Sequence, residues 1–370
     1  MEDKSKAMKL KVTQENLNKA LGLVARVASS RGTLPILSNV LLKISDNRLT
    51  VSATNLDIAI SCELGAQVQA EGALTVPARL LQDFVNSLPA GVIELEQDEQ
   101  RLKVTTDSYK SVINGVSAEE FPVMPAIDSG TSWKVSGPIL KSALQQILIA
   151  ASGDESRPVL TGVYFHTVDG VLYVAATDSY RLAEKRLMKL KEKVQLLIPA
   201  TALHDVLRII NDYADDIVIV HDDQQVQFRA GDVELVARLI EGNYPDYRKL
   251  IPASFATTAT MPRAELVGIV KVSSLFARES AGSIVVSVDE PSSSIWIHAV
   301  ASQLGENNAT LKVEANGTGS ITLNSRYLLD GLQAMDAKTV KLGFNGKLEA
   351  AMLSATDADD YIHIIMPLKS

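Results

Sequence analysis

The sequence predicts an α+β fold made of three tandem repeats, each with two helices packed on antiparallel sheets. Three observations lead to this prediction. Short motifs recur at a spacing of about 120 residues, each repeat has the same order of helical and alternating hydrophobic patterns, and turn signals separate the alternating stretches. At roughly 100 to 200 residues per domain, a chain of 370 residues can hold several such units.

One series of motifs marks the start of the second helix in each repeat. Pro77-Ala78 precedes an apolar helical pattern, and so does Pro199-Ala200, which lies 122 residues later. Asn324 stands in the same relation, 125 residues after Pro199. Such regular spacing is typical of repeat architectures, in which each unit completes its core against its neighbours.

A second series marks the ends of the repeats. Phe121-Pro122, Tyr244-Pro245 and Met366-Pro367 follow one another at steps of 123 and 122 residues. The motifs Ala53-Thr54-Asn55 and Ala176-Thr177-Asp178 add a further step of 123. The spacing predicts three units of about 120 residues with boundaries near 128 and 254.

Apolar residues at helical spacing predict two helices in each repeat. Leu17, Leu21 and Val24, for example, form one stripe that would pack on a sheet. Alternating patterns such as 49–53 and 295–299 predict strands, and Asn345-Gly346 is a hairpin signal because both residues accept a positive φ. The expected helix windows are 13–28, 78–88, 137–151, 200–211, 262–278 and 325–335.

The composition is that of an ordinary globular protein, with 46% hydrophobic and 22% charged residues and a mean hydropathy of +0.10. No apolar run reaches the roughly 18 to 20 residues of a membrane helix, and the chain start lacks the apolar stretch of a signal peptide. We therefore expect a cytoplasmic protein with no membrane partner. The one cysteine, Cys62, alternates with Ile58 and Ile60, which favours a buried strand position over a reactive thiol.

The distribution of charge is more informative than the net charge of −8. The six helix windows hold nine basic and five acidic residues, a net charge of +4, so the rest of the chain carries −12. A positive helical face on an otherwise acidic protein would attract a polyanion to one surface. The count alone also fits bases that only keep solvated helix faces soluble.

From about residue 8 to its C-terminus the chain resembles the bacterial DNA polymerase III beta subunits, the sliding clamps. The resemblance implies a disordered extension at 1–7, before the usual family start, and three domains at 8–128, 129–254 and 255–370. The resemblance depends on the three-fold repeat and on five motifs that occur in order. They are Thr33-Leu34-Pro35-Ile36-Leu37, Thr75-Val76-Pro77-Ala78-Arg79, Ala176-Thr177-Asp178-Ser179-Tyr180-Arg181-Leu182, Tyr244-Pro245-Asp246-Tyr247-Arg248 and Ile365-Met366-Pro367-Leu368.

The resemblance implies a head-to-tail homodimer that closes into a six-domain ring of DNA-clamp domains with helices around the hole. Its implied partners are double-stranded DNA held without sequence specificity, the DNA polymerase III catalytic subunit, the clamp loader and other proteins with clamp-binding motifs. No cofactor and no metal are implied. The implied DNA-facing residues are Lys19, Arg26, Arg31, Arg79, Lys141, Arg208, Arg263, Lys271, Arg278 and Arg326.

The resemblance also implies a peptide-binding pocket between the second and third repeats. An apolar cleft with a flexible Met can repack around several ligands, and one or two Arg groups can orient a peptide backbone or an acidic side chain. From the residues alone, 364–368 equally fits a last core strand, and one strand can serve both purposes. The implied pocket residues are Arg157, Leu160, Thr177, Ser179, Tyr180, Arg181, Leu182, Pro245, Lys249, Leu250, Ile364, Ile365, Met366, Pro367 and Leu368.

The chain departs from the family pattern at several places. Ser179-Tyr180 stands where well-known relatives have Gly-His, Lys249 where an Arg is common, and Lys369-Ser370 where many relatives end in Arg-Leu. We therefore expect the outline of the pocket to persist while the polarity of its rim changes. Pro158-Val159 and Thr201 also offer little to DNA, so direct contacts from the second repeat are in question.

Nothing in the sequence points to catalysis. The five histidines lack metal-ligand spacing, and the acidic pairs Asp215-Asp216, Asp222-Asp223 and Asp359-Asp360 fall in predicted turns, where solvated carboxylates are expected. The protein is therefore not expected to be an enzyme. Two alternatives stay open: an acidic three-repeat scaffold that binds proteins but not DNA, and a hydrolase built on paired carboxylates.

Overall fold

The computed structural model describes residues 7–127 except 29–33, then 129–212, 216–303 and 305–368. Contacts divide the chain into two compact units, each of which is described by itself. The N-terminal unit joins the chain up to Pro138 to His204–Leu239, and the C-terminal unit joins Ile139–Leu203 to the chain from Ile240 onward. Each unit thus combines a terminal repeat with one half of the middle repeat.

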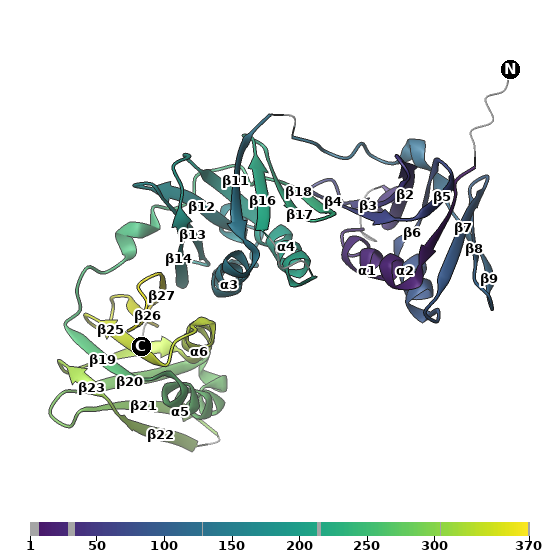
Figure 1. Cartoon of the computed structure of the whole chain (residues 1–370). Helices are drawn as coiled ribbons and strands as arrows, with labels where there is room; N and C mark the ends of the chain where they lie inside the picture. The colour runs from purple at the N-terminus through teal and green to yellow at the C-terminus, as the bar shows by residue number, and fades with distance from the viewer. Residues whose placement is uncertain (1–6, 29–33, 128, 213–215, 304, 369–370) are drawn as a thin grey trace. The chain divides into compact units, whose positions relative to one another are not determined.

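The N-terminal unit contains two antiparallel sheets (Figure 1). The five-stranded sheet has the order β5 (Gln67–Ala70), β1 (Lys9–Thr13), β7 (Val92–Asp98), β8 (Arg101–Thr105), β9 (Lys110–Asn114). The nine-stranded sheet has the order β10 (Val116–Ser117), β6 (Gly72–Pro77), β2 (Asn39–Ser45), β3 (Arg48–Thr54), β4 (Ile58–Gly65), β18 (Val233–Arg238), β17 (Gln225–Ala230), β16 (Asp216–His221), β11 (Thr131–Ser136).

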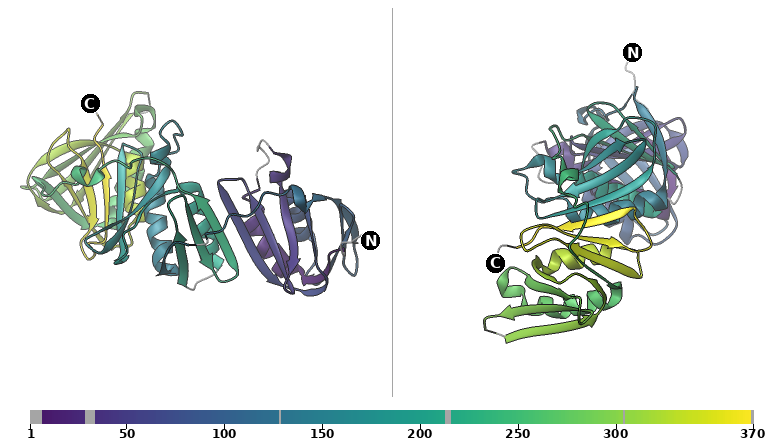
Figure 2. Two further views of the ribbon diagram at one scale, coloured as in Figure 1. Left: turned by 90° about the horizontal axis from the view of Figure 1, so that it is seen from above. Right: turned by 90° about the vertical axis from the view of Figure 1, so that its left-hand side faces the viewer.

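The C-terminal unit also contains a nine-stranded and a four-stranded sheet, and the strands at the end of the chain lie beside β14 (Figures 1 and 2). The larger sheet has the order β15 (Gln195–Pro199), β12 (Gly162–Val168), β13 (Val171–Thr177), β14 (Arg181–Lys189), β27 (Tyr361–Ile365), β26 (Ala351–Ala355), β25 (Thr339–Phe344), β19 (Thr257–Pro262), β23 (Glu314–Asn316). The smaller has the order β22 (Gly305–Lys312), β21 (Ser294–Ala301), β20 (Ser283–Asp289), β24 (Gly319–Asn324).

Five of the six helices are shorter than the predicted windows, and the fourth is one residue longer. They are α1 (Gln14–Val24), α2 (Ala78–Ser87), α3 (Gly137–Ile147), α4 (Ala200–Asp212), α5 (Arg263–Phe276) and α6 (Ser325–Ala334). Local signals explain two of the starts: the Thr13 hydroxyl accepts from the Asn16 amide, and the Asn324 side chain accepts from the amides of Arg326 and Tyr327. Within their units α1 contacts α2, and α5 contacts α6.

The predicted helical charge of +4 is wrong for these helices. Arg26 lies two residues beyond α1, Arg278 lies in a short 3-10 helix after α5, and Asp212 falls inside α4. The six helices hold seven basic and six acidic residues, a net charge of only +1. Any attraction of a polyanion to the helices therefore depends on individual exposed basic residues and not on the net charge of the helices.

One strand pairing occurs in both units in the same register. In the N-terminal unit β4 pairs with β18, with Ala59 opposite Val236; in the C-terminal unit β14 pairs with β27, with Leu182 opposite Ile364. Each pairing joins the first half of one repeat to the second half of the next. The corresponding strands β22 and β9 have no such neighbour and lie at sheet edges.

This register corrects the third landmark of the sequence. The Met366 amide donates to the Tyr180 carbonyl at 2.8 Å, just as the Arg238 amide donates to the Asp57 carbonyl at 2.9 Å. Met366 is therefore the structural counterpart of Arg238, and not of Tyr244 as the step of 122 residues suggests. The resemblance of Met366-Pro367 to Tyr244-Pro245, an apolar residue followed by proline at a similar spacing, is therefore a coincidence.

Two histidines are buried in the C-terminal unit. His166 Nε2 lies 2.7 Å from the Tyr247 hydroxyl, which itself donates to the Glu184 carboxylate, so the imidazole donates its Nε2 proton to Tyr247. Burial, and secondly the charge of Arg248, lowers the pKa of His166 to about 4. Burial, and secondly Arg181, lowers the pKa of His363 to about 3.

These two imidazoles predict acid sensitivity. Because the unfolded chain binds their protons below pH 6.5 and the folded chain does not, the free energy of unfolding should fall as the pH drops from about 6.5 towards 4, by roughly 2 kcal/mol per imidazole between pH 7 and pH 5. Urea unfolding at the two pH values measures this change.

The controls use single substitutions. His166→Gln and His363→Gln should each remove about half of the pH dependence, because each removes one of the two buried imidazoles. Equal stability at pH 7 and pH 5 would contradict the prediction.

Candidate peptide-binding site

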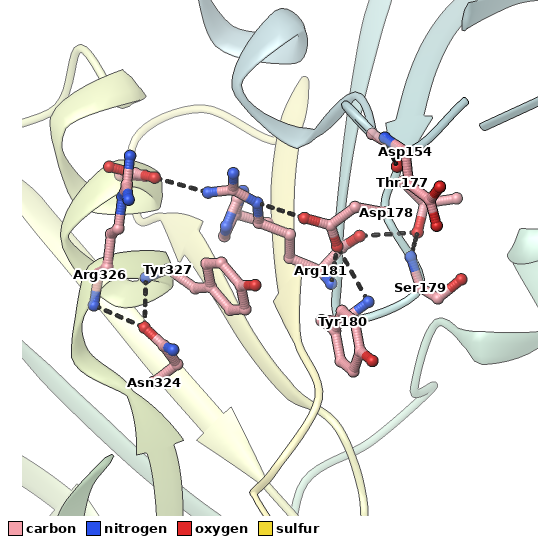
Figure 3. A network of polar contacts seen from close by, with 12 residues as sticks. Asp154, Thr177, Asp178, Ser179, Tyr180, Arg181, Asn324, Arg326 and Tyr327 are labelled. Atoms are coloured by element: carbon pink, nitrogen blue, oxygen red, sulfur yellow. Dashed lines mark hydrogen bonds and ion pairs between the residues drawn. The ribbon is translucent and has the colours of Figure 1, made fainter. Parts of the chain in front are cut away.

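The turn between β13 and β14 forms one wall of the candidate site (Figure 3). The Asp178 carboxylate accepts from the backbone amides of Tyr180 and Arg181, both at 2.9 Å, and the Thr177 hydroxyl donates to the Arg181 carbonyl at 2.7 Å. Ser179 has a φ of 77°, in the left-handed region that favours glycine. Such a backbone suits glycine, and here a serine adopts it.

Arg181 is a fixed cation in this wall and not a free one. Its guanidinium donates to Asp178 at 3.0 Å and to Asp330 of α6 at 2.6 Å, and it lies 4.5 Å from the centre of the Tyr327 ring. Only 13% of its side chain is exposed. The two carboxylates and the ring hold the Arg181 guanidinium, which links the turn to α6, and its place in the predicted pocket stays a prediction.

The end of the chain forms the next wall. Met366 is bound through its amide to Tyr180, and the Leu368 amide donates to the Thr322 carbonyl at 2.9 Å. These bonds extend β27 past its last strand residue and leave the side chains of Met366, Pro367 and Leu368 half-buried. The tail thus continues the strand edge, and its partly accessible side chains are compatible with the predicted pocket.

The segment 244–251 brings the remaining residues to the same place. Tyr247 packs in a buried cluster with Ala175, Leu182 and Ile364, and Ile251 packs against that cluster. The Tyr244 ring stacks on Tyr164 with centroids 4.9 Å apart. These anchors hold the exposed residues of the segment, Pro245, Lys249 and Leu250, beside the cluster.

The structure divides the fifteen predicted pocket residues by depth. Leu160, Leu182, Ile364 and Ile365 are buried, and for Ile364 and Ile365 this burial fits the last core strand that the sequence also allows. Thr177, Arg181, Met366, Pro367 and Leu368 are half-buried, and Arg157, Ser179, Tyr180, Pro245, Lys249 and Leu250 are exposed. Leu250 and Tyr180 expose 55% and 62% of their surface, and with the tail they offer an apolar surface to a ligand.

Two contributors were missed by sequence reasoning. Asp330 and Tyr327 of α6 fix Arg181 from the third repeat, 149 and 146 positions along the chain. Asp330 had been counted only as a helical acid. No local sequence signal marks these contacts with Arg181. The acidic residue on a helix that packs against the neighbouring repeat is only a weak hint.

The Arg157 guanidinium is the accessible cation of this site. It is exposed and donates to the Ser179 hydroxyl at 3.2 Å. Lys249, the other exposed base, bonds to Asp246 at 2.7 Å, which raises the pKa of its ammonium group. An acidic group of a ligand would thus meet Arg157 first.

The predicted DNA-facing bases differ in their surroundings. Arg263 donates to the carbonyls of Ala337 and Leu332, which ties the start of α5 to the end of α6, and Arg208 bonds to Asp205. Lys141 is half-buried, and Arg31 lies outside the described residues. The exposed members are Lys19, Arg26, Arg79, Arg208, Lys271, Arg278 and Arg326.

The acidic pairs have structural contacts. Asp222 accepts from the amides of Gln224 and Gln225 at a tight turn, while Asp359 and Asp360 bond to Arg186 and Lys185. Asp215 lies outside the described residues. Among the residues that the structure describes, no group of three or more acidic, His or Cys side chains could hold a metal ion, and no helix is long and apolar enough to cross a membrane.

Models of three protein families match the chain in order. Residues 8–125 match the N-terminal domain of the DNA polymerase III beta subunit, residues 134–246 the central domain and residues 248–369 the C-terminal domain. Together these matches cover nearly the whole chain and follow the three repeats.

Known sliding clamps are similar to this chain over nearly the full length of both proteins. The chain is 32% identical to the beta sliding clamp of Synechococcus elongatus, over 98% of this chain and 99% of that protein, and 31% identical to that of Synechocystis. Its structure matches the DNA polymerase sliding clamp of Bacillus subtilis with a TM-score of 0.94 and 26% identity, covering 98% and 100% of the two chains. It matches the Pseudomonas aeruginosa sliding clamp bound to griselimycin with a TM-score of 0.92 and 25% identity. The chain belongs to the DNA polymerase III beta subunit family, the sliding clamps that serve as processivity factors of DNA polymerase.

Proposed function

We propose that two copies of this chain close head to tail into a ring that encircles duplex DNA and tethers the DNA polymerase III catalytic subunit. The clamp loader and other proteins with clamp-binding motifs would use the same peptide surface, and the protein would perform no catalysis itself. The three domains of this proposal keep the boundaries 8–128, 129–254 and 255–370.

The observation that carries the ring is the pair of unmatched edge strands. Within the chain, β4 pairs with β18 and β14 pairs with β27. By repeat equivalence β22 should pair with β9, yet both are edge strands here. A second copy can supply each partner: β9 of one chain to β22 of the other, and the reverse. Such a heterologous contact closes when each repeat turns the chain by about one sixth of a circle.

Exposed side chains on these edges support the pairing. Val112 at the centre of β9 is 55% exposed, and the β22 residues alternate between exposed and half-buried. An open edge with an apolar residue invites another strand, and closure into a ring removes that edge. The expected particle has twice the mass of the 39.9 kDa chain.

The dimer proposal predicts that Val112→Asp weakens the dimer, because pairing would make Val112 a cross-strand neighbour of β22, and the substitution would replace that apolar contact by a charge. We expect at least a tenfold rise in the dimer dissociation constant, measured by analytical ultracentrifugation. Val92→Asp is the matched control, since Val92 is 58% exposed on β7, an interior strand of the same sheet. A monomeric parent protein at micromolar concentration, or equal effects of both variants, would contradict the ring.

Topological capture explains how an acidic protein can hold DNA. A closed ring cannot leave circular DNA, so its contacts with phosphates need not be strong and can break as the ring slides. A net helical charge of +1 is compatible with this mode, provided that some bases are accessible. Arg79, Lys271 and Arg326, on α2, α5 and α6, are all exposed.

The DNA proposal predicts that replacing Arg79, Lys271 and Arg326 together by Glu shortens retention on nicked circular DNA at low salt. It should also reduce the slope of log affinity against log salt, by up to about 2.7 for three lost phosphate contacts. Replacing the exposed Lys191, Lys193 and Lys347 by Glu makes the same charge change outside the helices and should have little effect. Equal retention of the helix variant and the parent would contradict the proposal.

The proposed peptide surface consists of Tyr180, Leu250, Met366 and Leu368 around Arg157. The half-buried and exposed apolar groups would receive apolar side chains of a partner peptide, and Arg157 would meet an acidic group. Griselimycin, which is bound to the similar Pseudomonas aeruginosa clamp, is a suitable probe of this surface.

The peptide proposal predicts that Leu250→Asp weakens griselimycin binding by roughly tenfold to a hundredfold, as expected for one lost apolar contact of 1.5 to 3 kcal/mol. Leu275→Asp is the control, because Leu275 is 50% exposed on α5, a helix of the same unit that holds none of the predicted pocket residues. Calorimetric titration gives the affinities and thermal unfolding checks both folds. Unchanged binding by Leu250→Asp would overturn the assignment. Leu182→Asp is unsuitable because Leu182 is 97% buried core.

The alternative of a protein-binding scaffold without DNA shares the repeats and the peptide surface. No observation favours it over the clamp, and the retention experiment on circular DNA separates the two. The hydrolase alternative has less support, because Asp222 accepts from the amides of a turn and both Asp359 and Asp360 form ion pairs.

A further inference from the structure

A small hollow in the N-terminal unit lies at the pairing of β4 with β18. It has a volume of about 120 Å³ and is lined by residues of the turn before β4, the end of β18 and the segment that follows the first repeat, among them Leu56, Asp57, Ala59, Val123, Val236 and Arg238. The volume approaches the about 150 Å³ of an apolar cavity that admits a benzene ring, so the hollow can take one side chain.

The backbone around this hollow repeats that of the peptide surface in the C-terminal unit. Thr54 Oγ1 donates to the Ile58 carbonyl at 3.0 Å as Thr177 does to Arg181, and Asn55 accepts from two turn amides as Asp178 does. Leu56 has a φ of 79° where Ser179 has 77°.

The strand that completes each turn is also held alike. Arg238 and Met366 donate their amides to Asp57 and Tyr180, the fourth residue of the respective turns. Both units therefore present the same frame, a left-handed turn beside the end of a paired strand.

Smaller side chains leave the frame of the N-terminal unit hollow. Ala59 and Val236 occupy the paired positions that Leu182 and Ile364 fill in the other unit. Each replacement removes at least one methylene or methyl group from the floor. Val123, which is 95% exposed, and Leu56, which is 45% exposed, leave apolar surface at the rim.

Two polar groups at the hollow point to a peptide ligand. The Arg238 guanidinium is exposed and has no salt-bridge partner among the described residues, and the Gln225 Oε1 atom is buried without a hydrogen-bond partner there. The first suits a carboxylate, and the second lacks an N–H partner that a peptide backbone can supply once the Gln225 side chain turns into the hollow. The Asp57 carboxylate, also at the hollow, can accept another N–H of an extended chain.

We infer that the N-terminal unit carries a second peptide-docking site, which takes a linear segment of a partner protein with an apolar side chain next to an acidic one. The apolar side chain fills the hollow over Ala59, the acidic one pairs with Arg238, and the peptide backbone donates to Gln225. This site goes beyond the proposed peptide surface in the C-terminal unit, where a half-buried Met366 takes the place of Arg238.

Methyl NMR of the full-length protein tests both sites at once. The probe is the peptide acetyl-Ser-Leu-Asp-Leu-Gly-amide at up to about 5 mM, a range suited to millimolar affinity. We expect shifts of the Leu56, Val123 and Val236 methyl signals that saturate with peptide. Replacing Asp by Asn in the peptide, or Arg238→Gln in the protein, should weaken this binding at least fivefold.

Val123→Glu should abolish these shifts, and Leu348→Glu, at another highly exposed apolar residue, should leave them intact. The absence of shifts at Leu56 and Val123, or equal binding of the Asp and Asn peptides, would overturn the inference. Concentration-dependent shifts without peptide would show a second copy of the chain as the occupant and would also overturn it. Signals of Leu250, Met366 and Leu368 report the other surface separately, so failure of one site is distinguishable from failure of the other.

Discussion

The pairing of a strand from one repeat with a strand from the next is the constraint on which this structure depends. A sheet edge presents unpaired N–H and C=O groups, and a soluble protein must cover or pair them. The chain does so twice internally, by placing β18 beside β4 and β27 beside β14. As a result the compact units do not coincide with the repeats: each large sheet runs through a repeat boundary, and the middle repeat is divided between two units.

The candidate peptide surface follows from the same pairing. Where β14 meets β27, the turn before one strand and the tail after the other are held together by a backbone hydrogen bond from Met366 to Tyr180. Arg181 then links this turn to α6 through Asp330 and lies on the Tyr327 ring. The paired strand ends therefore create a ledge of half-buried apolar groups, and the ion pairs beneath it limit its movement. Rigid support of this kind reduces the ordering cost of binding.

Much of the architecture could be predicted from sequence because the signals were local and repeated. Helical stripes such as Leu17, Leu21 and Val24 are buried as expected, and Cys62 is buried on β4. The predictions failed where a residue's role depended on distant partners. Arg26 and Arg278 extended the apolar helical pattern but lie beyond the helix ends, and the depth of Leu182 depends on Tyr247 and Ile364, which come from other parts of the chain. The counterpart of Met366 required the strand register, which no single motif reveals.

Equivalent frames with different side chains show how a repeat protein can diversify without changing its backbone. The turns at Leu56 and Ser179 each place one residue in the left-handed region, and its amide donates to a threonine hydroxyl two residues earlier. The strand pairing next to each turn requires this course of the backbone. Side chains that only line the frame are free of this requirement. Leu182 and Ile364 fill the floor in one unit, whereas Ala59 and Val236 leave a hollow in the other, and Arg238 replaces Met366 at the edge. Backbone hydrogen bonding thus conserves the shape of both places, while packing and charge at a few positions decide what each can bind.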